Sequence, residues 1–233
     1  MSNPHCSSNA HTQKAAFWLA YTAVALTVIE YIFSPSFFKA NYPEWSGLQH
    51  GLYPNLWWAI GTFVLYLPVP MLVIRFVFRE SLSEYGWSWR IKREHWLLYG
   101  AMLLGMAPIV VIAASLPSFT AVYPFYRGAR EAQIAAVFAW EAAYLAQFLA
   151  LEFFFRGVLA IGLGRSIGRL AVWVAMVPYC MIHYHKPMPE ALASIVAGIV
   201  LGEIAQRSRS IAGGVLVHAS VALSMDLLAM TRR

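Results

Sequence analysis

Several ionisable side chains interrupt the long apolar stretches of this sequence, and eight of them are candidates for chemistry. On insertion scales, an ionisable side chain at bilayer depth is unfavourable by about 2.5–3.5 kcal/mol, so each one calls for a partner or a function. Carboxylates and imidazoles transfer protons in acid–base catalysis, and they also bind zinc. The eight residues are Glu30, Glu141, Glu152, Arg156, His183, His185, His218 and Asp226.

Glu152 and Arg156 are four residues apart, so on a helix they share one face and can pair. A buried ion pair that only fixes helix packing would explain both residues, and so would a functional site. Glu141 precedes Glu152 by eleven residues, which puts the two carboxylates roughly 16 Å apart on one helix face. They cannot form a close acid–base pair, and we expect Glu141 to support a neighbouring helix or to line the same cavity.

The following apolar stretch ends with a proline, a tyrosine and two histidines. Tyr179 and His183 are one helical turn apart, and Pro178 stands directly before Tyr179. A proline frees a backbone carbonyl, which suits a helix that bends around a cavity. His185 lies near the end of the stretch, where we expect it at the membrane interface.

The last apolar stretch carries His218 and Asp226, which are eight residues apart and separated by roughly 80° around a helix. They could therefore reach one cavity at different depths. A single histidine within a membrane is more often structural than functional. Two histidines on separate helices, with Glu152 and Arg156 on a third, favour a functional site.

The composition defines the class of protein that must position these residues. Of the 233 residues, 60% are hydrophobic and 12% are charged, against about 25% charged in an ordinary soluble domain. So few polar residues could not cover the outside of a soluble domain. The composition excludes disordered, fibrous and disulfide-rich proteins and predicts an all-α, polytopic membrane helix bundle. The net charge of +6 comes from scattered Lys and Arg, which act as topology signals and do not indicate nucleic-acid binding.

A membrane-spanning helix needs about 20 mostly apolar residues, and seven stretches qualify within a range of six to eight. We expect a short cytoplasmic N-terminus at 1–14, N-terminal transmembrane helices over 15–134 and a helical core over 135–233. Gly198 and Gly202 permit close helix contact, within the bundle or between subunits. The seven stretches lie near residues 15–33, 56–78, 96–116, 135–163, 170–185, 190–205 and 211–230.

The basic residues predict an orientation. Counting outward from the basic loop 79–93, ten Lys and Arg fall on the side of the N-terminus and six on the other side, with Arg156 inside a span. Cytoplasmic loops carry the excess of Lys and Arg, so the N-terminus is predicted inside and the C-terminus outside. The segment 82–96 mixes aromatic and basic residues, which predicts an interfacial helix; a plain loop is the alternative.

Four motifs in order resemble those of the CPBP family, also called Abi, the CAAX-type and bacteriocin-processing intramembrane endopeptidases. The run from Glu152 to Gly157 resembles the family's EExxxRG, and Tyr179-xxx-His183 resembles its second motif. The segment 201–211 is similar to the linker LGxxxxR-T/S-gs-I. His218 stands where the family has HxxxN. The resemblance covers about residues 141–226.

Two positions depart from the family pattern. Leu151 replaces the first of two adjacent glutamates, which commonly activates the water, and Ala222 replaces the asparagine. Either the protein is inactive, or it belongs to a subgroup in which Glu152 takes that role. The run from His185 to Pro187, with His218 and Asp226, is similar to a subgroup that includes the myxosortase-like sorting proteases of some bacteria.

The resemblance implies that the protein hydrolyses a peptide bond of a membrane-associated precursor. Glu152 would be the general base, with His183 and His218 bonding the water or donating to the oxyanion and leaving amine. Arg156 completes the catalytic set. The supporting residues are Glu141, Tyr179, His185 and Asp226.

A zinc site formed by Glu152, His183 and His218 is the runner-up mechanism, but the sequence has no HExxH helix, so we expect no cofactor. The alternative to an enzyme is an inactive CPBP-like scaffold or immunity protein. Membrane lipids and a membrane-associated protein or peptide are the expected partners, with no nucleic acid. The expected location is a bacterial cell (inner) membrane, as a multi-pass protein, and the expected substrate is a bacterial precursor with a C-terminal anchor helix.

Overall fold

A computed structural model describes residues 4–231, with side chains from residue 11 onward, and over this range the chain is helical with no strand. The all-α fold class is confirmed. Residues 4–14 of the predicted N-terminal segment 1–14 are part of the first helix, and residues 1–3 lie outside the described range. The long helices are α1 (Pro4–Tyr31), α4 (Leu52–Tyr66), α6 (Arg93–Ala113), α8 (Ile134–Glu152), α10 (Leu170–Met181), α11 (Met188–Ser208) and α12 (Ala212–Thr231).

Shorter helices complete the chain. Two π-helical segments continue longer helices, η2 (Val73–Val77) after α5 and η5 (Phe153–Gly162) after α8. Three 3-10 turns lie at η1 (Leu48–Gly51), η3 (Leu82–Tyr85) and η4 (Arg127–Arg130). The short α-helices are α2 (Pro35–Asn41), α3 (Pro43–Ser46), α5 (Pro68–Leu72), α7 (Pro117–Thr120) and α9 (Leu163–Ile167).

Within the described range, five helices are long and apolar enough to cross a membrane. A sixth span results if His11–Tyr31 and Pro35–Asn41, bent by 49°, count as one. The chain is therefore a multi-pass membrane protein, with fewer clear spans than the predicted seven. Two expected spans differ: α1 qualifies only together with α2, and α10 ends at Met181 and not near residue 185, so its 12 residues rise only about 18 Å. The five spans are Leu48–Val77, Arg93–Ala113, Ile134–Ile167, Met188–Ser208 and Ala212–Thr231.

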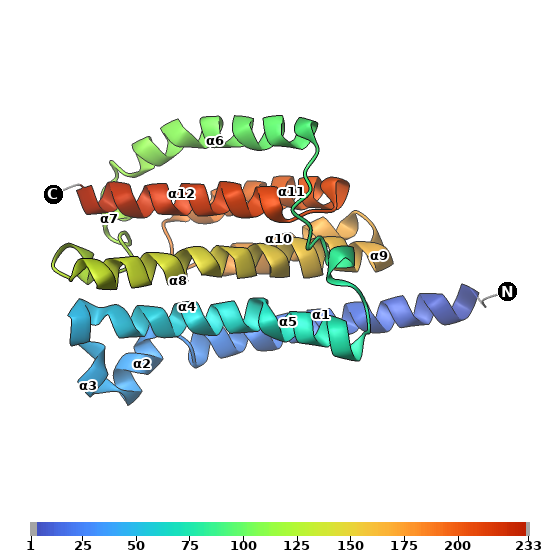
Figure 1. The fold of residues 1–233 in the computed structure, drawn as a ribbon, viewed down its shortest axis with the longest axis horizontal. Helices are drawn as coiled ribbons and strands as arrows, with labels where there is room; N and C mark the ends of the chain where they lie inside the picture. Colours follow the sequence, from blue (N-terminus) through green and yellow to red (C-terminus); the bar gives the residue numbers. More distant parts are fainter. Residues whose placement is uncertain (1–3, 232–233) are drawn as a thin grey trace.

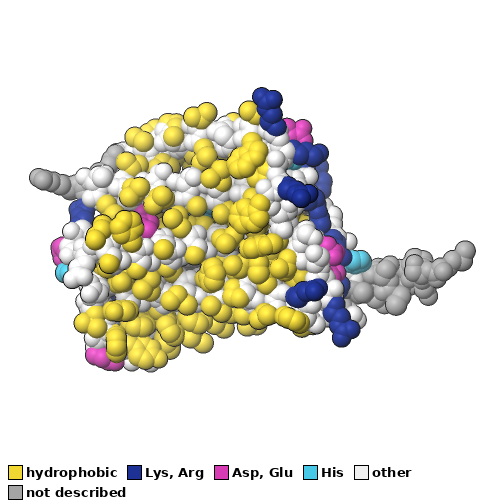
Figure 2. Space-filling view, viewed as in Figure 1, with side chains coloured by type: hydrophobic (Ala, Val, Ile, Leu, Met, Phe, Trp, Pro, Cys, Tyr) yellow, Lys and Arg dark blue, Asp and Glu magenta, His cyan; other side chains and the backbone are white. Residues whose placement is uncertain are grey.

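The long helices run back and forth along the long axis of the molecule, and the two termini lie at opposite ends (Figure 1). The closest pairs are α10 with α11, α4 with α8, and α6 with α12. Hydrophobic side chains cover the middle of the visible face, and Lys and Arg gather at the end where the chain begins (Figure 2). We call this the basic end; it corresponds to the side that the sequence predicts as cytoplasmic.

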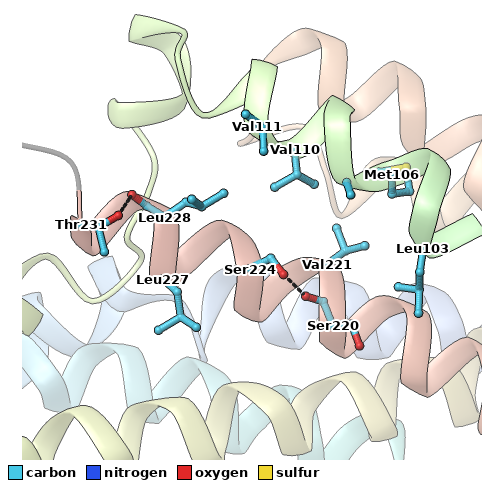
Figure 3. A pocket seen from close by; sticks show the side chains of 11 residues that line it. Leu103, Met106, Val110, Val111, Ser220, Val221, Ser224, Leu227, Leu228 and Thr231 are labelled. Atoms are coloured by element: carbon cyan, nitrogen blue, oxygen red, sulfur yellow. Dashed lines mark hydrogen bonds between the residues drawn. The ribbon is translucent and has the colours of Figure 1, made fainter.

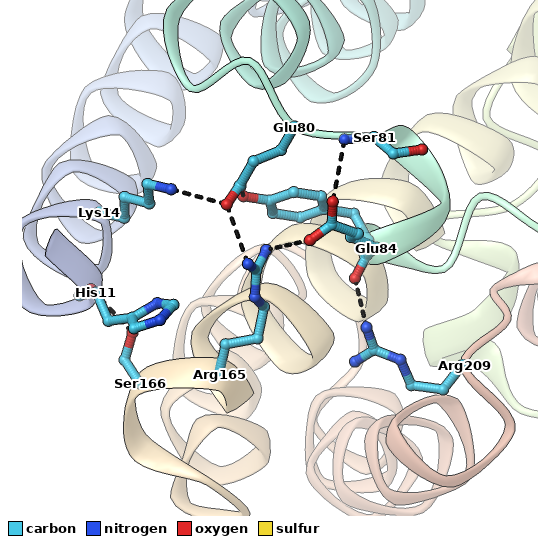
Figure 4. A network of polar contacts seen from close by, with 9 residues as sticks. His11, Lys14, Glu80, Ser81, Glu84, Arg165, Ser166 and Arg209 are labelled. Carbon is cyan, nitrogen blue, oxygen red and sulfur yellow. Dashed lines mark hydrogen bonds and ion pairs between the residues drawn. The ribbon is translucent and has the colours of Figure 1, made fainter. Parts of the chain in front are cut away.

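An ion-pair network ties several elements together at the basic end (Figure 4). Lys14 Nζ lies 2.7 Å from Glu80 Oε1, and Arg165 lies 3.0 Å from the carboxylates of both Glu80 and Glu84. Arg209 Nη2 donates to the Glu84 carbonyl oxygen at 2.7 Å. The network therefore joins α1, the loop after η2, α9 and the turn between α11 and α12.

The predicted interfacial helix at 82–96 is wrong. Only the single turn η3 forms, because Gly86 has a φ of +75° and ends it, and α6 begins at Arg93. The backbone after η3 bonds instead to the turn before α12. Ile211 N donates to the Gly86 carbonyl at 3.0 Å, and Ser210 Oγ donates to the Ser88 carbonyl. These contacts replace the bonds that a continuous helix would make within itself.

Small residues let α10 and α11 approach closely. A Cβ at Gly198 or Gly202 would lie 3.1 Å from the Tyr179 ring or 2.8 Å from Val172, so both glycines face α10 within the bundle. Helix α6 stands further out, and an apolar groove of about 420 Å³ separates part of it from α12 (Figure 3). The hydroxyl of Ser224 in this groove is satisfied by the carbonyl of Ser220 at 2.7 Å.

Candidate active site in the C-terminal helices

Glu152 and His218 meet where α8 passes α12. His218 Nδ1 lies 3.0 Å from Glu152 Oε1, and the Glu152 side chain is fully buried. Gly214, one turn before His218, makes this approach possible, since a Cβ there would lie 2.2 Å from Glu152 Oε2. Because a carboxylate only accepts hydrogen bonds, an ionised Glu152 holds the proton of a neutral His218 on Nδ1 and leaves Nε2 as an acceptor.

Arg156 lies on the other side of the Glu152 carboxylate. Its Nε is 3.4 Å from Glu152 Oε2, and its guanidinium carbon is 4.0 Å from the centre of the Tyr179 ring. Both charged side chains are buried, as an ion pair and a cation–π contact allow. The predicted pairing of Glu152 with Arg156 is therefore present, but His218 makes the shorter contact with the carboxylate.

Tyr179 connects the two histidines. Its carbonyl oxygen lies 2.8 Å from His183 Nδ1, and its hydroxyl lies 3.4 Å from His218 Nε2. Since a carbonyl oxygen can only accept, the His183 proton sits on Nδ1 and the Nε2 of a neutral ring is an acceptor. His183 holds this place because α10 ends at Met181 and the chain turns.

A cavity of about 560 Å³ runs from the end of the bundle opposite the basic end towards its middle. The side chains of His183 and His218 line it, whereas Glu152 and Arg156 do not and lie behind them. The expected convergence thus brings the two histidines to one cavity, and Glu152 reaches it through His218. Leu151, at the position where the family has its first glutamate, lines the cavity wall.

Glu141 and Asp226 belong to a different cluster. Asp226 accepts hydrogen bonds from the Phe125 backbone at 3.2 Å and from Trp140 Nε1 at 3.1 Å. Glu141 interacts with the Asp226 carboxyl group, and its buried carboxyl oxygens have no other partner in the described part of the chain. Neither residue lines the cavity. Through these two hydrogen bonds, Asp226 connects α12 to α8 and to the loop before α8.

His185 lies at the mouth of the cavity, in the turn between α10 and α11. Its Nε2 is 3.2 Å from Glu30 Oε1 near the end of α1, and both side chains are more than half exposed. The mouth also includes Lys186, whose Nζ donates to Glu190 Oε1 at 2.7 Å and to the Tyr123 hydroxyl at 3.1 Å. These contacts place ionisable side chains around the mouth, and the interfacial position of His185 stays a prediction.

The zinc alternative needs Glu152, His183 and His218 around one ion. Among the side chains described, residues 11–231, no group of three or more His, Cys, Asp and Glu is placed to hold a metal ion. Glu152 and His218 are in contact, but His183 does not join them as a third ligand of one centre.

Several residues of the cavity wall were not among the sequence candidates, and three of them are important below. Thr62 and Tyr66 of α4 and Gln147 of α8 lie in the cavity wall. A signal was present in the sequence, because Thr62 and Tyr66 are polar and one turn apart in an apolar helix. Nothing in the sequence indicated that α4 would pack beside α8.

A comparison with known protein families found a match over the helices that hold the candidate site. Residues 132–224 match the family profile described as type II CAAX prenyl endopeptidase Rce1-like. Searches of curated proteins and of solved structures each found no match. The profile match spans less than half of the chain and includes Glu152, Arg156, His183 and His218. It confirms the resemblance of the C-terminal helices to the CPBP, or CAAX-type, family of intramembrane proteases that the sequence motifs indicate.

Proposed function

We propose that this protein is an intramembrane endopeptidase that hydrolyses a peptide bond of a membrane-associated precursor, with Glu152 and His218 acting as one proton-accepting unit. The observation that carries the proposal is the 3.0 Å contact between these two residues, with His218 in the wall of a cavity inside the bundle. Family membership supports a protease in general. The roles of the residues are our proposal.

The attacking water would give its proton to the Glu152–His218 pair. Glu152 holds the His218 proton on Nδ1, so Nε2 can accept a hydrogen bond from water. The contact between Nε2 and the Tyr179 hydroxyl is long, at 3.4 Å, so a water in the cavity can compete for that nitrogen. A positioned general base supplies about 10²–10⁴-fold of rate. His218 takes the proton at Nε2, and Glu152 orients the ring and stabilises the imidazolium that forms.

His183 would position the water. With its proton on Nδ1 and bonded to the Tyr179 carbonyl at 2.8 Å, its neutral ring can accept a hydrogen bond at Nε2 but cannot donate one there. This supports a contact with the water and argues against donation to the oxyanion. Arg156 is proposed as a positioning residue that balances the buried charge of Glu152 and holds Tyr179 through its ring.

The walls of the cavity indicate the substrate class. Aliphatic and aromatic side chains form most of the lining, among them Leu26, Ile29, Trp58 and Phe148. An apolar peptide segment fits such a wall. We propose a precursor anchored by a C-terminal helix, processed in a bacterial cell membrane without a cofactor.

The test is whether a precursor accumulates when the protein is removed. Membrane proteins of a deletion strain would be compared with the parent by mass spectrometry of their termini. Wild-type protein should restore the processed form, whereas Glu152→Gln and His218→Gln at equal protein levels should not. Normal processing in the deletion strain, or with both variants, would overturn the proposal.

A second candidate is an inactive membrane scaffold, and Leu151 is the observation that favours it. The side chain that lines the cavity at this motif position is apolar, and the remaining glutamate is buried behind a histidine. A scaffold would keep its cellular role in Glu152→Gln, His183→Ala and His218→Ala tested one at a time. Loss of that role in any variant that accumulates normally favours the enzyme.

A further inference from the structure

Three buried polar side chains in the cavity wall have no hydrogen-bond partner within the described residues. They are the Thr62 and Tyr66 hydroxyls and the Gln147 amide oxygen. Thr62, Tyr66 and Gln147 are 3%, 1% and 4% exposed, so bulk solvent does not satisfy them. Buried polar groups in proteins are nearly always hydrogen-bonded. Three exceptions in one cavity therefore point to a ligand that supplies the missing partners.

The three groups occupy facing helices. Thr62 and Tyr66 are one turn apart on α4, and Gln147 precedes Leu151 by one turn on α8, which packs along α4. The Tyr66 ring cannot turn away, because it stacks on Phe154 at 4.7 Å between ring centres and at an angle of 6°. Its hydroxyl is thereby held in the wall, in the same cavity as His218.

We propose that Thr62, Tyr66 and Gln147 form a binding wall for the main chain of the substrate. Each peptide group offers one carbonyl acceptor and one N–H donor. The two hydroxyls can donate to carbonyl oxygens, and the Gln147 oxygen can accept from an N–H. Such contacts bind the peptide main chain whatever its sequence. The apolar residues of the wall contact the peptide side chains. The inference rests on the proposed peptidase function and names how the peptide is held.

Helix α1 provides matched controls of the same residue types. The Tyr21 hydroxyl donates to the Leu65 carbonyl at 2.6 Å, and the Thr22 hydroxyl donates to the Trp18 carbonyl at 2.7 Å. Neither residue lines the cavity. A hydroxyl that is satisfied within the protein stabilises the fold, whereas removal of an unpartnered one is neutral or stabilising. The same substitutions should therefore have opposite effects on stability in the cavity wall and in α1.

The experiment measures stability and peptide binding in the same purified variants. Thr62→Val, Tyr66→Phe and Gln147→Met should keep or raise the unfolding temperature. Each should weaken binding of a fluorescent, end-blocked hydrophobic pentapeptide in detergent micelles by about 2- to 10-fold. Thr22→Val and Tyr21→Phe should lower the unfolding temperature and leave the peptide affinity unchanged. Mass spectrometry verifies that the peptide stays intact.

Backbone recognition has its own readout. Pentapeptides with an ester in place of each amide in turn lack one N–H, and one of them should bind the wild-type protein more weakly. The Gln147→Met variant should bind that ester and the parent peptide equally well, because the variant lacks the amide oxygen that accepts from the N–H. Equal affinity of all cavity variants, or no binding to wild-type protein, would overturn the inference. Failure of precursor processing would instead overturn the proposed function, since that assay uses no pentapeptide.

Discussion

His218 stands between Glu152 and the cavity, with its Nδ1 3.0 Å from the carboxylate and its ring in the cavity wall. A carboxylate behind an imidazole sets its tautomer and orientation, as in hydrolases that use a histidine as base. Glu152 can therefore act through His218 without contacting the substrate. The predictions below separate the parts of this unit.

Glu152→Gln keeps the size of the side chain and removes its charge. We expect turnover to fall by about 10²–10⁴-fold, the contribution of a general base. Arg156 also loses its partner, and breaking a buried ion pair costs roughly 3–5 kcal/mol of stability. Arg156→Gln in the same background should recover part of that stability without recovering turnover. Protein level and precursor cleavage are measured together, and normal cleavage by Glu152→Gln would show that cleavage does not depend on the Glu152 carboxylate.

Leu151→Glu places a carboxylate in the cavity wall, at the position where the family has its first glutamate. In the Glu152→Gln background, we expect it to restore part of the lost cleavage, because the new carboxylate can meet the water directly. Leu151→Gln, equal in size but without a base, is the control and should restore nothing. Equal rates for the two double variants would show that position 151 has no access to the water.

Chelation tests the role of metal. We expect purified protein treated with a strong zinc chelator to keep its cleavage rate, because the proposed unit accepts the proton without a metal. Elemental analysis should find less than stoichiometric zinc. Activity that disappears on chelation and returns with added zinc would favour the zinc mechanism.

Glu80 at the basic end should make stability depend on pH. Burial opposes its ionisation, but hydrogen bonds from Lys14 and Tyr85, with the charge of Arg165, outweigh burial and hold the pKa of Glu80 below its ordinary value of 4.5. A lowered pKa contributes stability above pH 4.5 that is lost as the pH falls through the folded-state pKa.

Glu80→Gln should therefore lower the free energy of unfolding at pH 7 by about 1–3 kcal/mol, as hydrogen bonds to charged groups contribute. The difference from wild type should shrink as the pH falls from 5 to 3, measured by thermal unfolding in detergent. Glu94→Gln is the control, because Glu94 is exposed and 3.9 Å from Lys92, and it should change little. A pH-independent difference would indicate a packing effect of Glu80 alone.

The sequence predicted the pairing of Glu152 with Arg156 from helical spacing, and the approach of His183 and His218 from the order of the family motifs. It could not predict which motif residue faces the cavity. Leu151 and Glu152 are adjacent in α8, where neighbouring side chains emerge about 100° apart, and the packing of α8 against α4 and α12 decides which of them meets the cavity. Leu151 thus lines the cavity and Glu152 does not.

Long-range packing limited the remaining predictions. Asp226 shares a helix with His218 but bonds to Trp140 and the Phe125 backbone, and helical spacing alone did not reveal those partners. The loop after η3 mixes aromatic and basic residues as an interfacial helix does, yet its carbonyls bond to residues 210–211. The sequence did not predict Thr62 and Tyr66 as cavity residues, because they line the cavity only through the packing of α4 beside α8.

The mouth of the cavity and the basic end lie at opposite ends of the bundle. Its mouth is formed by the connections after α1 and α10, whereas the Lys14–Glu80–Arg165 network closes the other end. If the basic end faces the cytoplasm, as the distribution of Lys and Arg predicts, the proposed precursor would present its cleavage site only after that segment has been exported. Cleavage would then be timed by secretion, and a substrate stalled in the cytoplasm would be spared without any inhibitor.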